Sequence, residues 1–289
     1  MRHFVPESLH FIIMTVEEII QKALGNEYAG DYKLEASGFS SVYLVSGKSA
    51  KYIVKIYDKI GISMSEANGL NALKENQAKV PEVISCGDQY IAMEYILKGN
   101  PQRNDLIEML IRLYSNKAEQ FGYTMDNTIG SLIQKNKLCH TFHDFFWKYR
   151  LLPRFEQAVR NGFFKEKDAD VFYDIYLSFL SRYDFSYSCL VHGDLWNGNV
   201  LASSNGYYII DPSVAYSNPG QDLAMLALFG SPLTSGDLAY IFEAVTGLKD
   251  FPARISFFQL YPLLVHINLF GSSYTSRFRN ALKDCGGNL

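Results

Sequence analysis

The stretch LVHGDLWNGN, residues 190–199, decides the fold of this chain. Within it, Asp194 stands five residues before Asn199, and apolar residues flank the segment on both sides. A loop between two buried segments would hold a carboxylate that accepts a proton close to a side-chain oxygen that binds a metal. Taken alone, His192-Gly193-Asp194 could equally be a turn, with Asn199 a surface residue.

A second carboxylate follows at the end of a predicted strand. The run YYIIDP, residues 207–212, is apolar up to Asp211, which lies twelve residues after Asn199. These separations match the catalytic loop and the metal-binding carboxylate of kinases. Mg²⁺ is usually held by one or two carboxylates together with substrate phosphates, so Asn199 and Asp211 suffice as its ligands. We therefore predict that Asp194 is the catalytic base of a phosphotransferase that uses ATP and Mg²⁺.

The first third of the chain shows the alternation that is typical of strands. Strands are predicted at residues 32–35, 41–45, 51–57, 83–84 and 90–95, a hairpin turn at 46–49, and helices at 15–24 and 63–74. From Asn104 onward the pattern is helical, apart from apolar stretches at 199–201 and 207–210.

These patterns predict an α+β fold of two lobes, like that of protein kinases. Residues 14–96 would form a small antiparallel-sheet lobe that binds ATP, and residues 97–289 a larger, mainly helical lobe for catalysis and substrate binding. Residues 1–13 would be a poorly ordered extension. The cleft between the lobes is the expected ligand site.

The turn between the first two predicted strands lies where a loop that covers phosphates belongs. Its residues are Ser37, Gly38, Phe39 and Ser40. A single glycine is far short of a glycine-rich signature, so an ordinary hairpin turn explains this segment equally well.

Lys55 interrupts an apolar predicted strand. A lysine that faces the inside of a sheet is costly unless it is paired. Glu66 on the following helix is the predicted partner, as in the kinase pair that positions the α- and β-phosphates; the alternative is that both charges are solvated. Met93-Glu94-Tyr95-Ile96 is the predicted hinge, where the Glu94 carbonyl and the Ile96 amide would hydrogen-bond adenine.

Composition bounds the possible partners. The 289 residues carry a formal net charge of -3, so nothing favours a nucleic-acid partner. No apolar run reaches the roughly 18 residues of a membrane span. The four cysteines show neither paired nor metal-binding spacing, which predicts free thiols in a reducing cytoplasm.

Gly193 occupies the position before Asp194, where regulated protein kinases carry an arginine. Without that arginine, a phosphorylated activation loop has no ready partner. The segment after Asp211 is also short before a helix that is predicted to begin near Gln221. Both features favour a constitutively competent enzyme that acts on small molecules.

From about residue 30 onward, the sequence resembles the fructosamine (ketosamine) kinase family, a branch of the aminoglycoside-phosphotransferase-like kinases. The segment 192–199 resembles the family signature GDLWxGN, and further matches lie at 66–70, 80–84, 93–95, 121–130, 145–151, 222–225 and 260–271. The resemblance implies phosphorylation of the sugar 3-hydroxyl of ketoamines formed by glycation. The product then breaks down and frees the amine, so the implied role is deglycation.

The resemblance also suggests substrate-binding residues. Trp196 would stack on the sugar ring, or alternatively pack in the core, and His266 and Asn268 match the family but are more typical of helix packing. Two departures stand out. The stretch 217–221 lacks a glutamate that the family often has before the Asp-Leu-Ala helix, and Thr128 stands where an aromatic residue is usual.

Two rival functions remain open at this point. One is a phosphotransferase that acts on an aminoglycoside, choline or another amino alcohol, whose acceptor site should be rich in carboxylates. The other is an inactive kinase-like protein that only binds nucleotide. The joint presence of Lys55, Glu66, Asp194, Asn199 and Asp211 argues against the second.

Overall fold

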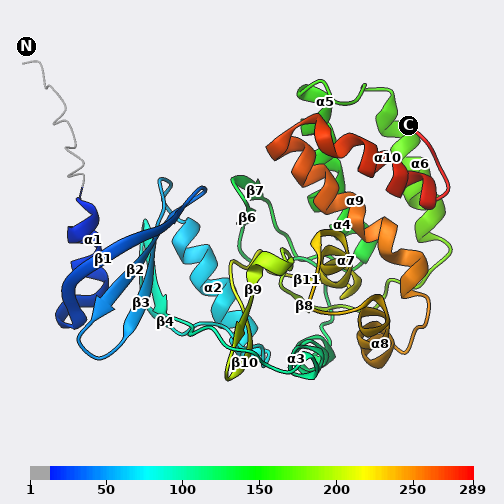
Figure 1. Ribbon diagram of the computed structural model, residues 1–289. Helices are drawn as coiled ribbons and strands as arrows, with labels where there is room; N and C mark the ends of the chain where they lie inside the picture. The colour runs from blue at the N-terminus through cyan, green and yellow to red at the C-terminus, as the bar shows by residue number, and fades with distance from the viewer. Residues whose placement is uncertain (1–13) are drawn as a thin grey trace, which may run out of the picture.

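A computed structural model describes residues 14–289 and shows two lobes (Figure 1). The smaller lobe holds one antiparallel sheet in the order β1-β2-β3-β5-β4. Its elements are α1 (Val16–Leu24), a 3-10 turn (Gly25–Glu27), β1 (Tyr28–Ser37), β2 (Ser41–Gly47), β3 (Lys51–Ile56), α2 (Ile62–Glu75), β4 (Val83–Gly87) and β5 (Tyr90–Glu94). The α+β two-lobe fold is therefore confirmed. The predicted extension, residues 1–13, lies outside the described residues.

Each face of the sheet has its own helix. Val54 packs in a cluster with Ile20 and Leu24 of α1, whereas its neighbours Ile53 and Lys55 point to the cleft side. Successive side chains of a strand alternate between faces, so the apolar run of β3 can serve a core and a ligand site together. This alternation directs Lys55 into the cleft.

Helix α1 begins as its sequence predicts. Thr15 Oγ1 accepts a hydrogen bond from the Glu18 amide at 3.2 Å, and the Glu18 carboxylate accepts one from the Thr15 amide at 2.7 Å. This reciprocal capping box satisfies two backbone donors that a helix end otherwise leaves unpaired.

The larger lobe is mainly helical (Figure 1). Its helices pack around a core rich in aromatic side chains. Phe142 and Phe146 stack with centroids 4.7 Å apart, and Phe179 and Phe257 with centroids 4.6 Å apart. The helices are α3 (Arg103–Ser115), α4 (Phe142–Phe146), a π-helical turn (Trp147–Leu151), α5 (Leu152–Arg160), α6 (Asp168–Leu180), α7 (Gly220–Phe229), α8 (Ser235–Thr246), α9 (Phe251–Phe270), a 3-10 turn (Ser272–Tyr274) and α10 (Thr275–Asp284).

The larger lobe also contains three short antiparallel pairs. They are β6 (Asn127–Ile129) with β7 (Leu132–Gln134), β8 (Cys189–Val191) with β11 (Ala215–Ser217), and β9 (Val200–Ser203) with β10 (Gly206–Ile209). The apolar stretches at 199–201 and 207–210 coincide with β9 and β10, but the sequence did not predict their pairing, and the expectation of helices at the other four strands was wrong. The missed strands have three residues each, too few for alternation to identify them.

None of the helices in residues 14–289 is long and apolar enough to cross a membrane.

Candidate active site

The catalytic loop leaves β8 at Val191 and enters a 3-10 turn at Asn197–Asn199. Gly193 has φ +84°, and a Cβ at this position would lie 2.1 Å from the Ser213 carbonyl oxygen. Only glycine combines this conformation with so close an approach. The Ser213 amide in turn donates to the His192 carbonyl at 2.8 Å, so the loop is held against the segment that follows Asp211.

His192 is fully buried, and its ring makes hydrogen bonds to backbone groups of the loop and of Ile210. Its Nδ1 accepts from the Asp194 amide at 3.3 Å, so its Nε2 carries the proton and donates to the Ile210 carbonyl at 2.8 Å. Burial lowers the pKa of His192 to about 4, so the ring is neutral at pH 7. We assign His192 a positioning role, because both ring nitrogens are used within the loop.

Asp222 of α7 anchors the loop through its carboxylate. One oxygen accepts from the Gly193 amide at 2.8 Å, and the other from the His192 amide at 2.7 Å and the Tyr114 hydroxyl at 3.1 Å. Burial raises the pKa of Asp222 to about 6, although these hydrogen bonds oppose the rise. Sequence reasoning did not single out Asp222 as a site residue. The signal was a carboxylate at the start of an otherwise apolar helix, where a charge needs partners.

Asp194 lines the cleft while packing encloses it on the other sides. Burial, assisted by the negative charge of Asp222, raises the pKa of Asp194 to about 7. A carboxylate with such a pKa is a far better proton acceptor at neutral pH than an ordinary aspartate. A pKa near 7 is compatible with the role of base that the sequence predicts for Asp194.

Asn199 is buried beside Asp194 and is oriented by it. Its Nδ2 donates to the Asp194 carbonyl at 2.8 Å, which leaves the oxygen of the same carboxamide for another partner. Asp211 follows β10 with φ +58°, a left-handed conformation that few non-glycine residues adopt and that is common at functional sites. An amide oxygen and a carboxylate suit Mg²⁺, so these two residues fit the predicted metal.

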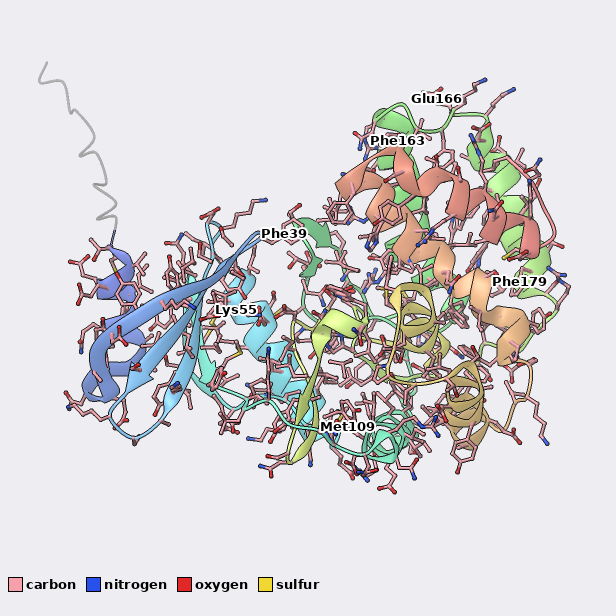
Figure 2. All side chains as sticks on the ribbon, viewed as in Figure 1. Phe39, Lys55, Met109, Phe163, Glu166 and Phe179 are labelled. Carbon is pink, nitrogen blue, oxygen red and sulfur yellow. The ribbon has the colours of Figure 1, made fainter. Side chains whose placement is uncertain are left out.

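Lys55 links the two lobes through ion pairs. Its Nζ lies 2.8 Å from a Glu66 carboxylate oxygen and also pairs with Asp211. The Tyr57 hydroxyl donates to the other oxygen of Glu66, a contact that the sequence did not predict. The pairing of Lys55 (labelled in Figure 2) with Glu66 is as predicted. The cation is buried and lies next to Asp211.

Two cavities meet at this cation. One, the polar cavity, of about 370 Å³, is the more polar of the two and is lined by Asp194, Asn199 and Trp196 together with Gly38, Phe39 and Ser40 of the β1–β2 turn. The other, of about 480 Å³, is mostly apolar and is lined by the hinge residues Met93, Glu94 and Ile96 together with Val42, Ile53, Pro81, Val200, Leu201 and Ile210. Lys55 and Asp211 line both cavities, so a ligand that spans them would pass this pair.

The apolar cavity has the features of a pocket for a flat heterocycle. The Ile96 amide makes no hydrogen bond within residues 14–289, which leaves it available to a ligand. Ser37, the first residue of the predicted phosphate loop, does not line either cavity, whereas the next three residues line the polar one.

The predicted substrate residues divide into two groups. Trp196 is 42% exposed, lies over Gly198 and lines the polar cavity beside Asp194. His266 stacks on Phe229 and bonds the Pro262 carbonyl at 2.8 Å, and Asn268 donates to the carbonyls of Arg154 and Leu264. Neither His266 nor Asn268 lines the polar cavity, so their substrate role stays a prediction.

The two-lobe fold, with Asp194 and the Lys55–Asp211 pair lining one cavity between the lobes, is that of the kinase-like phosphotransferases. Comparisons with known proteins narrow this class. A model of the fructosamine kinase family matches residues 12–286, and the chain belongs to that family.

Individual relatives agree with this assignment. A probable ketoamine kinase of Enterococcus faecium is 34% identical over 260 residues, which cover 85% of this chain and 91% of that protein. The crystal structure of a protein from Thermobifida fusca, assigned as a fructosamine-3-kinase, has a TM-score of 0.85 at 30% identity and covers 94% of this chain and 98% of that one. An ADP-bound aminoglycoside phosphotransferase shares the fold, with a TM-score of 0.59 at 15% identity over 93% of this chain and 96% of that one.

Proposed function

We propose that this protein transfers the γ-phosphoryl group of ATP to the sugar 3-hydroxyl of a ketosamine, such as a fructosamine or ribulosamine adduct. The observation that carries the proposal is the meeting of the two cavities at Lys55 and Asp211, with Asp194 in one cavity and the hinge in the other. Membership of the fructosamine kinase family supports the choice of acceptor.

In this proposal the apolar cavity binds adenine. The Ile96 amide and the Glu94 carbonyl hydrogen-bond its edge, while Val42, Ile53 and Leu201 contact its faces. Lys55, held by Glu66, directs its charge at the phosphates, and the backbone of residues 38–40 covers them. Most of the rate acceleration then comes from positioning and from charge stabilisation, since phosphoryl transfer requires little covalent chemistry from the protein.

Asn199 and Asp211 would hold Mg²⁺ through their side-chain oxygens, because this cation prefers oxygen ligands. A cation held there would supply positive charge to offset the negative charge that develops on the phosphates during transfer. Lys55 keeps Asp211 in place from the smaller lobe, and the Asp194 carbonyl keeps Asn199 in place from the loop.

Asp194 accepts the proton of the acceptor hydroxyl as the phosphoryl group moves in line. Trp196, two residues further along, offers the exposed face of its indole to the sugar ring, since an apolar ring face suits an aromatic surface. The resulting phosphorylated ketosamine would break down and free its amine, so the role is deglycation. The four free cysteines fit a reducing compartment such as the cytoplasm.

A substrate panel tests the proposal. The purified protein, with ATP and Mg²⁺, is offered fructosyl-lysine, ribulosyl-lysine, choline and an aminoglycoside, and ADP release is measured for each. We expect turnover of at least one ketosamine and of neither amino alcohol. The reverse pattern would show that the enzyme belongs functionally with the aminoglycoside and choline phosphotransferases, and ATP binding without any transfer would show an inactive kinase fold.

The Asp194→Asn variant is the matched control within the panel. Because general base catalysis contributes about 10²- to 10⁴-fold, its turnover should fall by that factor while its thermal unfolding stays close to that of the wild type. Near-normal phosphorylation by this variant would remove Asp194 from the role of base.

A further inference from the structure

The β6–β7 hairpin lies between the sheet of the smaller lobe and the helices of the larger lobe (Figure 1), and it borders the polar cavity. Thr128, Gly130 and Ser131 line this cavity together with Asp194 and Trp196. Phe39 of the phosphate loop lies close to this hairpin (Figure 2). A Cβ at Gly130, in the hairpin turn, would lie 3.1 Å from the Phe39 ring and 3.0 Å from Leu269. The hairpin therefore contributes to the cavity at which an acceptor must reach Asp194.

The hairpin is tied to the catalytic loop through the segment after Asp211. Asn127 Nδ2 donates to the Val214 carbonyl at 2.8 Å, and the Ser213 hydroxyl donates to the Thr128 carbonyl. The Ser213 amide donates a hydrogen bond to the His192 carbonyl. A displacement of the hairpin would therefore change its distance from Asp194 and would leave the hinge unaffected.

A second set of contacts holds the hairpin from behind. The Arg154 guanidinium donates to the Ile133 carbonyl, and that of Arg150 donates to the Lys135 carbonyl at 3.2 Å and to the Asn136 side chain at 2.7 Å. Between these carbonyls, the Tyr261 hydroxyl donates to Gln134 Oε1, while Gln134 Nε2 donates to Asn127 Oδ1 at 2.9 Å. We call Arg150, Arg154, Tyr261 and Gln134 the hairpin clamp.

The clamp contains an unusual charge arrangement. Arg150 and Arg154 are both buried, yet neither pairs with a carboxylate anywhere in residues 14–289. Arg150 lies against the Phe145 ring, 4.5 Å from its centroid, and its Nε has no hydrogen-bond partner among these residues. A buried guanidinium without an acid is a costly choice for stability alone. Apart from a bond to its neighbour Tyr149, the hydrogen bonds of Arg150 are all made to the chain just after β7.

We propose that the β6–β7 hairpin is the specificity-determining wall of the acceptor site and that the hairpin clamp residues are positioning residues that hold this wall at a fixed distance from Asp194. This inference rests on the proposed function in that it assigns the polar cavity to the acceptor. It adds that Thr128 and Ser131 contact the acceptor, and that Tyr261 and Arg150 act on acceptor binding without touching it.

The Tyr261→Phe variant tests the clamp, because it removes one hydroxyl and leaves the ring in place. We expect the KM for fructosyl-lysine to rise about three- to tenfold, while the KM for ATP and kcat stay within twofold of the wild type. Ser131→Trp, which adds bulk to the wall itself, should raise the same KM and again leave the KM for ATP unchanged.

Tyr176→Phe is the matched control. Tyr176 is equally buried, but its hydroxyl has no hydrogen-bond partner in the described chain, so its loss should leave both KM values unchanged. Equal changes in the KM for ATP and for the acceptor in Tyr261→Phe would overturn the proposal, as would a lower melting temperature with both KM values unchanged. If the wild type phosphorylates an amino alcohol in place of fructosyl-lysine, the proposed function fails, and the same KM comparison with that acceptor still decides the role of the hairpin.

Discussion

At the residue scale, the central feature is the pair of carboxylates Asp194 and Asp222, of which the second holds the backbone of the loop that carries the first. Asp222 accepts hydrogen bonds from the amides of His192 and Gly193. Burial and the negative charge of Asp222 together raise the pKa of Asp194. The pKa of the proposed base, Asp194, is therefore raised in part by Asp222, which is fully buried beneath the loop. Asp222 thus holds the loop in its conformation, whereas Asp194 is the proposed base.

The raised pKa of Asp194 has a direct consequence for the pH dependence of catalysis. Below about pH 7 the carboxyl is increasingly protonated and cannot accept the hydroxyl proton. We expect kcat/KM for the ketosamine to rise about tenfold per pH unit below pH 6 and to level off above pH 8, with an apparent pKa near 7. Steady-state rates between pH 5 and pH 9 measure this. A profile that is already flat at pH 5 would contradict the assignment of Asp194 as an elevated base.

At the element scale, the catalytic loop depends on a close backbone contact. Gly193→Ala would place a methyl group against the Ser213 carbonyl in a left-handed conformation that alone costs about 1–2 kcal/mol. Since 1 kcal/mol shifts the melting temperature of a protein of this size by about 2–4 °C, we expect a loss of about 2–8 °C. Turnover should fall more steeply, because Asp194 is the next residue.

Gly162→Ala is the control for this prediction. Gly162 has a similar φ of +80°, but no atom lies within 4 Å of an added Cβ, so it shares the conformational strain without the clash. Thermal unfolding and kcat of both variants, measured side by side, separate the two effects. If both variants lost the same stability and retained the same kcat, the contact with Ser213 would have no catalytic importance.

The sequence predicted the elements that carry strong local signals. The alternation of β3 placed Lys55 in the cleft, and the spacing of Asp194, Asn199 and Asp211 placed them around one cavity. It could not predict the hairpin clamp, because Tyr261 stands 127 residues beyond Gln134 in the chain and meets it only through tertiary packing. The strands β6 and β7 were missed because three residues each are too few for alternation to identify a strand.

At the scale of the whole molecule, the two lobes are coupled through α2. Its Asn68 accepts from the Tyr123 hydroxyl at 2.8 Å, and its Gly69 lies against Pro212, directly after Asp211. The same helix carries Glu66, the partner of Lys55. A ligand at the junction of the two cavities therefore contacts both lobes and should stabilise them as one unit.

This coupling predicts a metal-dependent stabilisation by nucleotide. A ligand that binds only the folded state at 100 times its Kd adds about 2.7 kcal/mol to the free energy of unfolding, or about 5–10 °C in melting temperature for a chain of this length. We expect ADP with Mg²⁺ to give such a shift and EDTA to remove most of it, because Asn199 and Asp211 can hold the phosphates only through a cation. In the Asp211→Asn variant, Mg²⁺ should add little to the effect of ADP alone. Differential scanning fluorimetry with ADP, Mg²⁺ and EDTA in all combinations measures these shifts, and an equal shift with and without the metal in the wild type would exclude Asp211 as a metal ligand.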